Sequence, residues 1–274
     1  MSKIKFAICN EVYQGWTLKQ AMAHAAATGY DAVEIAPFTL ARYVTDISAV
    51  ERRRIREMAA GTGIAICGIH WVLMHAEGMY LNHNEAAVRQ RTAKYLCDLV
   101  DFCGDLEGKI IVVGSPKQRN LLPGVTPAQA WDWAADTFRD AVKRAEARGV
   151  TLCLEPLAPA ETDFINTAAE AIRFAQQFQS ANFKIILDVK AMSSESKPIP
   201  QIIGESAPHF AHFHANDKNL KGPGFGDIDF RPISAALDEA GYEGYVSVEV
   251  FNFEEGAEVI ANQSLEYLRL TFNV

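Results

Sequence analysis

Eight short apolar runs recur along the 274-residue chain, and each leads into a stretch with the periodicity of an amphipathic helix. The runs occupy residues 4–10, 32–36, 64–70, 109–114, 150–155, 183–188, 210–214 and 245–250. The expected helices occupy residues 17–28, 48–61, 85–104, 127–148, 167–178 and 254–270, with shorter ones near 200–205 and 232–240. Runs that are apolar on both faces and alternate with helices predict a parallel sheet covered on both sides. Eight such units without a break in composition predict one (β/α)8 TIM barrel, a single domain over residues 1–274.

An open, doubly wound sheet is the alternative fold. It is disfavoured because no Gly-x-Gly-x-x-Gly motif opens a helix after the first run. Residues 192–200 are rich in serine and contain two prolines, which predicts a mobile loop at the barrel mouth. Residues 71–83 are a second candidate lid. Glycines, which tolerate the left-handed conformation needed at helix ends, stand at positions 29, 61, 149 and 241.

Composition narrows the class of protein. The formal net charge of −8 and the pI near 5.4 argue against a nucleic-acid binder, which needs a basic surface. Five cysteines, at positions 9, 67, 97, 103 and 153, lie scattered in apolar runs without CxxC spacing, which predicts reduced, buried thiols. The first run begins without a signal peptide, and no apolar stretch reaches the length of a membrane span. We therefore expect a cytoplasmic protein that binds neither nucleic acid nor membranes.

Four ionisable side chains stand at the carboxyl ends of the last four runs. Glu155, Asp188, His214 and Glu249 are separated by 33, 26 and 35 residues, about one βα unit each. In a barrel these ends converge on one face, where side chains are far more often functional than at the opposite face. Any one of the four alone would be assigned a structural role. Together, three carboxylates and an imidazole would repel one another without a cation and would suit Mn²⁺, Mg²⁺, Co²⁺ or Zn²⁺.

At these residues the chain resembles the xylose isomerase-like TIM-barrel superfamily, especially its sugar phosphate isomerases/epimerases and D-tagatose/D-psicose 3-epimerases. The resemblance extends over nearly the whole chain. Its motifs are Leu154-Glu155-Pro156, Leu187-Asp188-Val189, His212-Phe213-His214 followed by Gly222-Pro223-Gly224, and Ser247-Val248-Glu249. The resemblance implies one divalent metal ion, most often Mn²⁺, held by Glu155, Asp188, His214 and Glu249. It also implies that Glu155 and Glu249 are the catalytic acid/base pair that moves a proton at the carbon beside a substrate carbonyl.

The sequence departs from the ketose 3-epimerase pattern at two substrate contacts. Ala191 stands where those enzymes have a histidine, three residues after the metal-binding aspartate, and Leu220 stands in place of their arginine. Glu161 does match their substrate-binding glutamate. Lys190 is a candidate to occupy part of the vacated space, although an outward-facing, solvated lysine is an equal alternative.

Other candidate substrate contacts rest on position alone. His70 and Trp71 end the third run and are expected to form a wall of the substrate site, and Glu34 stands near the end of the second run. Lys117 and Arg119 follow the fourth run and would grip a phosphate or carboxylate, unless their loop is simply solvated. His212 lies two residues deeper than His214 on the same face and is expected to be a supporting or core residue.

The predicted function is a metal-dependent isomerase or epimerase of a ketose, ketose phosphate or related hydroxy-carbonyl compound, whose partner is a small sugar-like molecule. An alternative is a dehydratase of inosose or dehydroshikimate type, in which the same metal and base remove a hydroxyl as water. A DNA-repair enzyme related to apurinic endonucleases and a non-catalytic sugar-binding barrel are further alternatives. Members of the superfamily are often dimers or tetramers, so the resemblance admits a homo-oligomer of unspecified size.

Overall fold

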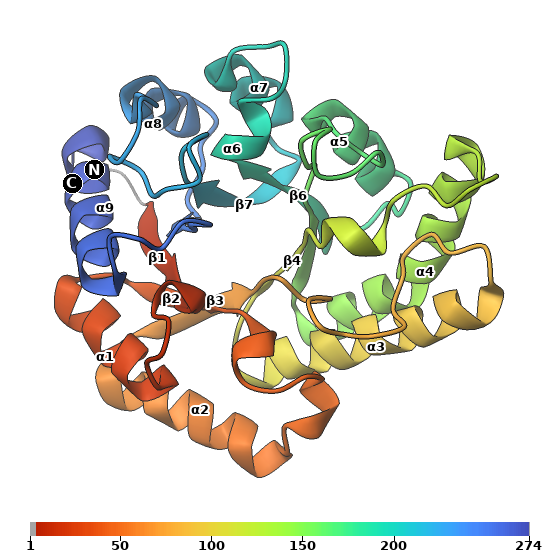
Figure 1. Ribbon diagram of the computed structural model, residues 1–274, viewed down its shortest axis with the longest axis horizontal. Helices are drawn as coiled ribbons and strands as arrows, with labels where there is room; N and C mark the ends of the chain where they lie inside the picture. The colour runs from red at the N-terminus through yellow and green to blue at the C-terminus, as the bar shows by residue number, and fades with distance from the viewer. Residues whose placement is uncertain (1–3, 274) are drawn as a thin grey trace.

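The computed structural model describes residues 4–273, in which eight parallel strands close into a barrel in chain order (Figure 1). The strands are β1 (Lys5–Cys9), β2 (Ala32–Ile35), β3 (Ala65–Ile69), β4 (Ile110–Val113), β5 (Thr151–Leu154), β6 (Phe183–Asp188), β7 (Phe210–Ala215) and β8 (Tyr245–Val248). The barrel closes because β1 pairs with β8, with Lys5 opposite Tyr245 and Ile8 opposite Val248. The (β/α)8 fold expected from the sequence is confirmed.

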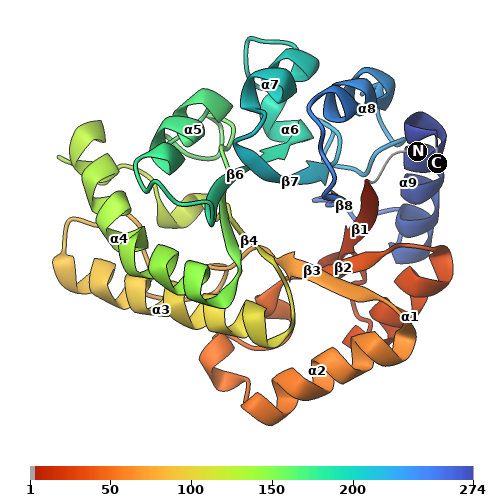
Figure 2. The same cartoon turned by 180° about the vertical axis from the view of Figure 1, so that it is seen from behind.

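Helices surround the barrel and cover the outer face of its sheet, as the views from both sides show (Figures 1 and 2). Helices α3 and α4 lie side by side over neighbouring strands. The helices are α1 (Leu18–Thr28), α2 (Ala49–Thr62), α3 (Ala86–Asp105), α4 (Pro127–Arg148), α5 (Ala168–Gln176), α6 (Val189–Met192), α7 (Ile199–Ser206), α8 (Phe230–Glu239) and α9 (Ala257–Phe272).

Capping residues explain where several helices begin and end. Four helices begin with a capping box, in which two residues hydrogen-bond each other reciprocally. The hydroxyl of the capping residue accepts from the backbone N–H three residues later, and the side chain of that later residue accepts from the backbone N–H of the capping residue. The capping residues are Thr17, Ser48, Thr126 and Thr167. Gly29 and Gly149 end α1 and α4 in the left-handed conformation, as expected. The expectation for Gly61 is wrong. It lies inside α2, and Gly63, with φ of 75°, ends that helix instead.

The two expected loops are more ordered than their composition indicates. Met192 ends α6, and residues 199–200 already belong to α7, so only residues 193–198 between them are irregular. The segment 71–83 buries Val72, Leu73 and Leu81 in the main hydrophobic core. Because these side chains are anchored, that segment is a packed wall of the barrel end.

The main core fills the layer between the sheet and the helices. Phe138 packs edge to face against Phe174 and Phe183 there, and burial of each such side chain contributes about 1.5–3 kcal/mol. All five cysteines are free thiols, and four of them are buried. Cys97 on α3 is partly exposed, which corrects the expectation that all five are buried. Within residues 4–273, no helix is both long and apolar enough to cross a membrane.

Candidate active site

Strand pairing brings the four predicted metal-binding side chains to one end of the barrel. Asp188 and His214 are direct partners in the pairing of β6 with β7. Glu155 follows β5 directly, and its N–H donates to the carbonyl of Val113 (3.1 Å). Glu249 follows β8, and its N–H donates to the carbonyl of Ala215 (3.2 Å). All four side chains therefore start from the same edge of the parallel sheet.

These four side chains form a compact, buried donor set. One ligating atom from each of Glu155, Asp188, His214 and Glu249 lies within 4.8 Å of all the others. All four residues are less than 9% exposed, and Asp188 and His214 are fully buried. Gly114 follows β4 directly, and a Cβ at that position would lie 2.0 Å from Glu155 Oε2. Any larger residue there would displace this carboxylate from its present position.

The negative charges of the buried carboxylates favour the binding of a cation at this set. Burial, followed by the negative charges of Glu249 and Asp188, raises the pKa of Glu155 to about 8. Burial and the charge of Glu249 likewise raise the pKa of Asp188. Glu249 Oε2 and His214 Nδ1 lie 3.1 Å apart, close enough for an ion pair, but neither atom makes a hydrogen bond of regular geometry within the described residues. Buried polar atoms of this kind are costly unless something binds them. A mixed oxygen and nitrogen donor set with excess negative charge fits a divalent metal ion.

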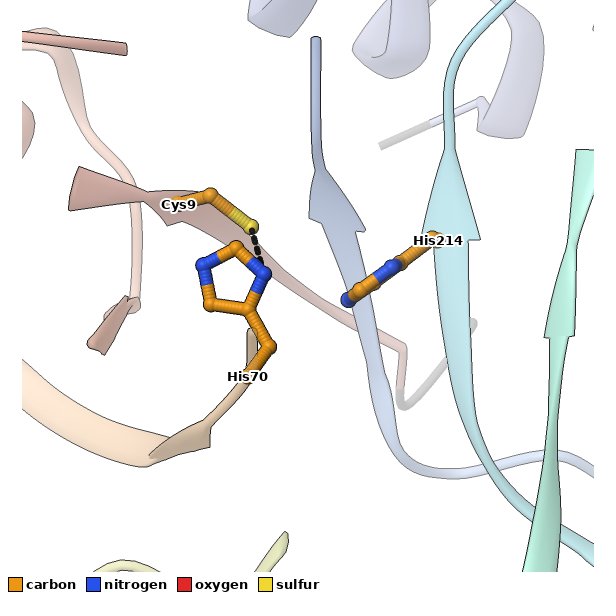
Figure 3. A group of neighbouring side chains, drawn as sticks. All are labelled: Cys9, His70 and His214. Carbon is orange, nitrogen blue, oxygen red and sulfur yellow. Dashed lines mark hydrogen bonds between the residues drawn. The ribbon is translucent and has the colours of Figure 1, made fainter. Parts of the chain in front are cut away.

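A second group of donors, Cys9, His70 and His214, lies nearby in the barrel (Figure 3). Figure 3 shows Cys9 from β1 and His70 from the end of β3 meeting opposite His214 on β7, with Cys9 Sγ 3.8 Å from His70 Nδ1. Burial and the charges of the surrounding glutamates raise the pKa of the Cys9 thiol well above its usual range. The thiol is neutral, and both nitrogens of His70 are already engaged by Glu11 and Glu249, so this group is the poorer candidate for a metal site.

His70 and Trp71 hold one oxygen of Glu249. Trp71 Nε1 donates to Glu249 Oε1 (2.8 Å), and His70 Nδ1 lies 3.3 Å from the same oxygen. On its other side His70 Nε2 lies 2.9 Å from Glu11 Oε2. Burial lowers the pKa of His70, but the charge and hydrogen bond of Glu11 outweigh it and raise this pKa to about 10. A charged His70 donates from both nitrogens and orients Glu249.

Glu11 is a site residue that the sequence analysis missed. It lies two residues beyond β1, and the strand-end rule applied to the first run would have identified it. Asn216, just beyond β7, was also missed. Its Nδ2 donates to Asp188 Oδ2 (2.5 Å), while the N–H of Ala191 donates to Asp188 Oδ1 (2.7 Å). Asp188 is thus oriented by the first turn of α6 and by Asn216.

Glu34 does not line the site, contrary to the expectation of a substrate contact. It lies within β2, is 0% exposed, and contacts His212 Nε2 (2.8 Å) and His214 Nε2 (3.2 Å). Burial raises the pKa of Glu34, but the two histidines outweigh it and hold this pKa well below its usual range. Glu34 and His212 therefore support His214 from inside the barrel. The expectation that His212 is a supporting residue agrees with this geometry.

The structure separates the two predicted basic loop residues. Lys117 is exposed, and among the described residues it lines neither cavity at this end of the barrel. Arg119 is fully buried beneath Glu155, and its Nη1 donates to the carbonyl of Glu155 (2.7 Å). Burial lowers the pKa of Arg119 to about 10, so it remains a cation at neutral pH. Arg119 supports Glu155 and has no exposed surface with which to grip an anion.

Lys190 points inward. Its Nζ lies 2.8 Å from Glu161 Oε1 and 3.9 Å from the centre of the Phe251 ring. Lys190, Glu161 and Phe251 line a cavity of about 90 Å³ that we call the catalytic cavity. Its other lining residues are His70, Trp71, Val112, Gly114, Ser115, Pro116, Glu155, Leu157 and Glu249. The predicted contacts His70, Trp71, Glu161 and Lys190 are therefore gathered around the two predicted catalytic glutamates.

Comparison with known proteins places this geometry in a family. The chain is 29% identical over 228 residues to a D-psicose 3-epimerase from Ruminiclostridium cellulolyticum, covering 82% of this chain and 75% of the relative. It is 22% identical over 265 residues to a fructoselysine 3-epimerase from Shigella flexneri, covering 94% of each. A solved D-psicose 3-epimerase from Clostridium cellulolyticum H10, bound to D-tagatose, has the same fold (TM-score 0.88, 24% identity, 98% of this chain and 99% of that chain). The family model described as xylose isomerase-like TIM barrel matches residues 22–271. The chain belongs to the xylose isomerase-like TIM-barrel family.

Proposed function

We propose that the protein is a divalent-metal-dependent epimerase that moves a proton at the carbon beside the carbonyl of a ketose or related keto-sugar. The observation that carries the proposal is the buried set of four donors at the ends of β5 to β8, all within 4.8 Å of one another. The relatives are named as sugar epimerases, which supports this function over the dehydratase alternative. The net charge of −8 opposes the DNA-repair alternative.

The residues that would hold the metal ion are Glu155, Asp188, His214 and Glu249. A bound divalent ion, with Mn²⁺ as the proposed metal, supplies Lewis-acid stabilisation of the negative charge that develops on the substrate oxygen. Each carboxylate oxygen of Asp188 already accepts a hydrogen bond, one from Ala191 and one from Asn216, so Asp188 is held in place and is poorly suited to move a proton. Its proposed role, like that of His214, is to hold the ion.

Glu155 and Glu249 are the residues proposed to transfer the proton. One carboxylate removes the proton, which leaves an enediolate, and the other carboxyl group returns a proton to the opposite face of the same carbon. The two glutamates come from β5 and β8, with β6 and β7 between them, so they reach the catalytic cavity from different sides of the donor set. His70 and Trp71 hold one oxygen of Glu249, which orients the second oxygen.

Lys190 and Glu161 are proposed to bind substrate hydroxyl groups at the edge of the catalytic cavity. Lys190 offers donors and Glu161 offers acceptors, and Glu161 Oε2 has no partner within residues 4–273. Lys190 is the proposed substitute for the histidine and arginine contacts that the sequence lacks at Ala191 and Leu220. The phenyl face of Phe251 below Lys190 keeps water from the ammonium group.

Exchange of solvent deuterium into the substrate tests the proposal. The Mn²⁺-loaded enzyme is incubated in D₂O with D-fructose, D-psicose and D-tagatose, and deuterium at the carbon beside the carbonyl is followed by NMR. We expect exchange in the wild type and its loss by at least about a thousandfold in Glu155→Gln and Glu249→Gln, since each removes a general acid or base.

A matched exposed variant, Glu57→Gln on α2, should exchange at the wild-type rate. Metal content is measured for every variant, so that loss of chemistry is separated from loss of the ion. Full exchange by Glu155→Gln and Glu249→Gln would remove both residues from the mechanism. Binding of these sugars without exchange would favour the non-catalytic sugar-binding alternative.

A further inference from the structure

A second, much larger cavity adjoins the catalytic cavity. It has a volume of about 600 Å³ and opens between the segments that follow β1, β2, β3 and β8. We call it the aromatic cavity, because its walls carry six aromatic side chains, Tyr13, Trp16, Phe38, Trp71, Phe251 and Phe253. Leu18, Leu40 and Met74 add to a predominantly apolar lining, whose polar members are Asn10, Glu11, Gln14, Thr17 and Thr39. Its volume falls within the range of small-molecule sites, about 300–1,000 Å³.

The two cavities share a wall. Trp71 and Phe251 line both, and their ring centres lie 6.0 Å apart. Trp71 also donates to Glu249, so the shared wall lies directly beside a proposed catalytic carboxylate. A ligand whose reacting carbon lies between Glu155 and Glu249 therefore reaches the aromatic cavity with the atoms that extend past Trp71.

The lining suits an apolar group better than the hydroxyl-rich part of a sugar. The aromatic rings can stack on the C–H face of a sugar, but a hydroxyl buried against them loses its hydrogen bonds to water, whereas an apolar group gains from the same burial. The catalytic cavity, at about 90 Å³, lies below the range of cavities that enclose a whole ligand. The polar, reacting part and the remainder of the substrate thus face environments of opposite character.

Glu11 marks the junction between the two environments. It lines the aromatic cavity and is 9% exposed, and its Oε2 is bound to His70. Its Oε1 has no hydrogen-bond partner in the described part of the chain. A buried acceptor without a partner calls for a donor from a ligand. An N–H or O–H beside the apolar group of a substrate would satisfy it.

We infer that the substrate is a keto-sugar conjugate, in which an apolar substituent of the size of an aromatic ring occupies the aromatic cavity while the reacting end of the keto-sugar occupies the catalytic cavity. This inference rests on the proposed function and specifies its substrate class. The substituent is linked through a group that donates a hydrogen bond to Glu11. A free ketohexose is too small to fill the combined site, whose aromatic cavity alone has a volume of about 600 Å³.

The test compares D-fructose with two conjugates that carry a phenyl group through an N–H at opposite ends of the sugar, 1-deoxy-1-(benzylamino)-D-fructose and 6-deoxy-6-benzamido-D-fructose. Dissociation constants are measured by calorimetry on Mn²⁺-loaded Glu155→Gln, which prevents turnover. We expect at least one conjugate to bind at least about tenfold more tightly than D-fructose, since burial of part of a phenyl ring is sufficient for that factor. In the wild type, deuterium exchange should show the same preference in kcat/KM.

A matched pair of variants tests whether the preference for the conjugates over D-fructose arises in the aromatic cavity. Leu40→Asp, made in the Glu155→Gln background, places a charge in the aromatic cavity and should abolish the preference for the conjugate. Leu270→Asp places the same charge on the exposed end of α9, where Leu270 is 71% exposed, and should leave the preference unchanged. Conjugates that bind no more tightly than D-fructose, or a preference that survives Leu40→Asp, would overturn the inference.

The outcomes also separate this inference from the proposed function. Tight binding of a conjugate that depends on Leu40, without deuterium exchange in the wild type, would reject the proton transfer and retain the aromatic cavity as a ligand site. Exchange with D-fructose that no conjugate improves would retain the proposed function and reject the substrate class.

Discussion

Trp71→Phe isolates the hydrogen bond that orients Glu249. The substitution removes the indole N–H that donates to Glu249 Oε1 at 2.8 Å and keeps an aromatic ring in the shared wall of the two cavities. A hydrogen bond to a charged group contributes about 1.5–3 kcal/mol. At 1.36 kcal/mol for each factor of ten, this corresponds to a rate loss of about 10- to 150-fold.

The structure favours the lower end of that range. Trp71 is only partly buried, and His70 Nδ1 still reaches the same oxygen at 3.3 Å after the substitution. We therefore expect kcat for deuterium exchange to fall about tenfold, with a smaller change in KM because the aromatic wall remains. The assay is exchange in D₂O with the keto-sugar that the wild type turns over fastest, with bound metal measured in parallel.

Trp131→Phe is the matched control, because Trp131 on α4 packs against Phe174 in the core between sheet and helices. It should leave kcat and metal content unchanged. A wild-type kcat in Trp71→Phe with full metal content would refute the orienting role. A loss of activity that addition of Mn²⁺ fully reverses would show that Trp71 acts only through metal retention.

Three further perturbations follow from the site. EDTA should abolish deuterium exchange and lower the melting temperature, and added Mn²⁺ should restore both. The reason is that a ligand at 100 times its Kd stabilises the native state by about 2.7 kcal/mol. An unchanged melting temperature would contradict the metal site. Glu34→Gln should lower the free energy of unfolding, measured with urea, by about 3–5 kcal/mol, because it leaves His214 without its buried carboxylate. Glu57→Gln should lower the same free energy by less than about 0.5 kcal/mol. Lys190→Met should raise KM about tenfold with a smaller effect on kcat, while Lys184→Met, at the far end of β6, should change neither.

Glu34 also gives the wild type a specific acid sensitivity. Its pKa in the folded protein is held well below 4.5, so its contribution to stability is fully present above that pH. As the pH falls below about 4.5, the unfolded chain takes up a proton that the folded protein does not, and the contribution is lost. Unfolding free energies measured between pH 6 and 3 should therefore decline less steeply in Glu34→Gln; equal slopes would contradict this assignment.

The side chains that the strand-end rule selected on the last four strands lie in one compact donor set, whereas Glu34 on β2 lies apart from it. Glu155 and Glu249 come immediately after β5 and β8, and both reach the barrel mouth. Glu34 pairs with Cys9 inside β2 and contacts His212 and His214, so its side chain belongs to a deeper layer of the barrel. An apolar run identifies a strand but does not give its register against the neighbouring strands, and the register decides the layer in which a side chain lies.

Supporting contacts were beyond the reach of sequence for a different reason. Glu11, His70 and Glu249 are contributed by the ends of β1, β3 and β8, so their hydrogen bonds join residues up to 179 positions apart. Arg119 could equally have faced solvent in its loop, and only the packing beneath Glu155 explains its burial. Periodicity describes neighbours along the chain and contains no information about such long-range pairs.

The sequence by itself determined the alternation of strands and helices, hence the closed parallel barrel, and the four ionisable residues at successive strand ends. These properties follow from local rules, because period, capping and strand length are decided by residues close together in the chain. Only the tertiary structure decided which of the polar residues share a cavity, that Lys190 points inward, and that an aromatic cavity adjoins the catalytic one. Those properties depend on how segments from four different strand ends pack together, which no single stretch of sequence specifies.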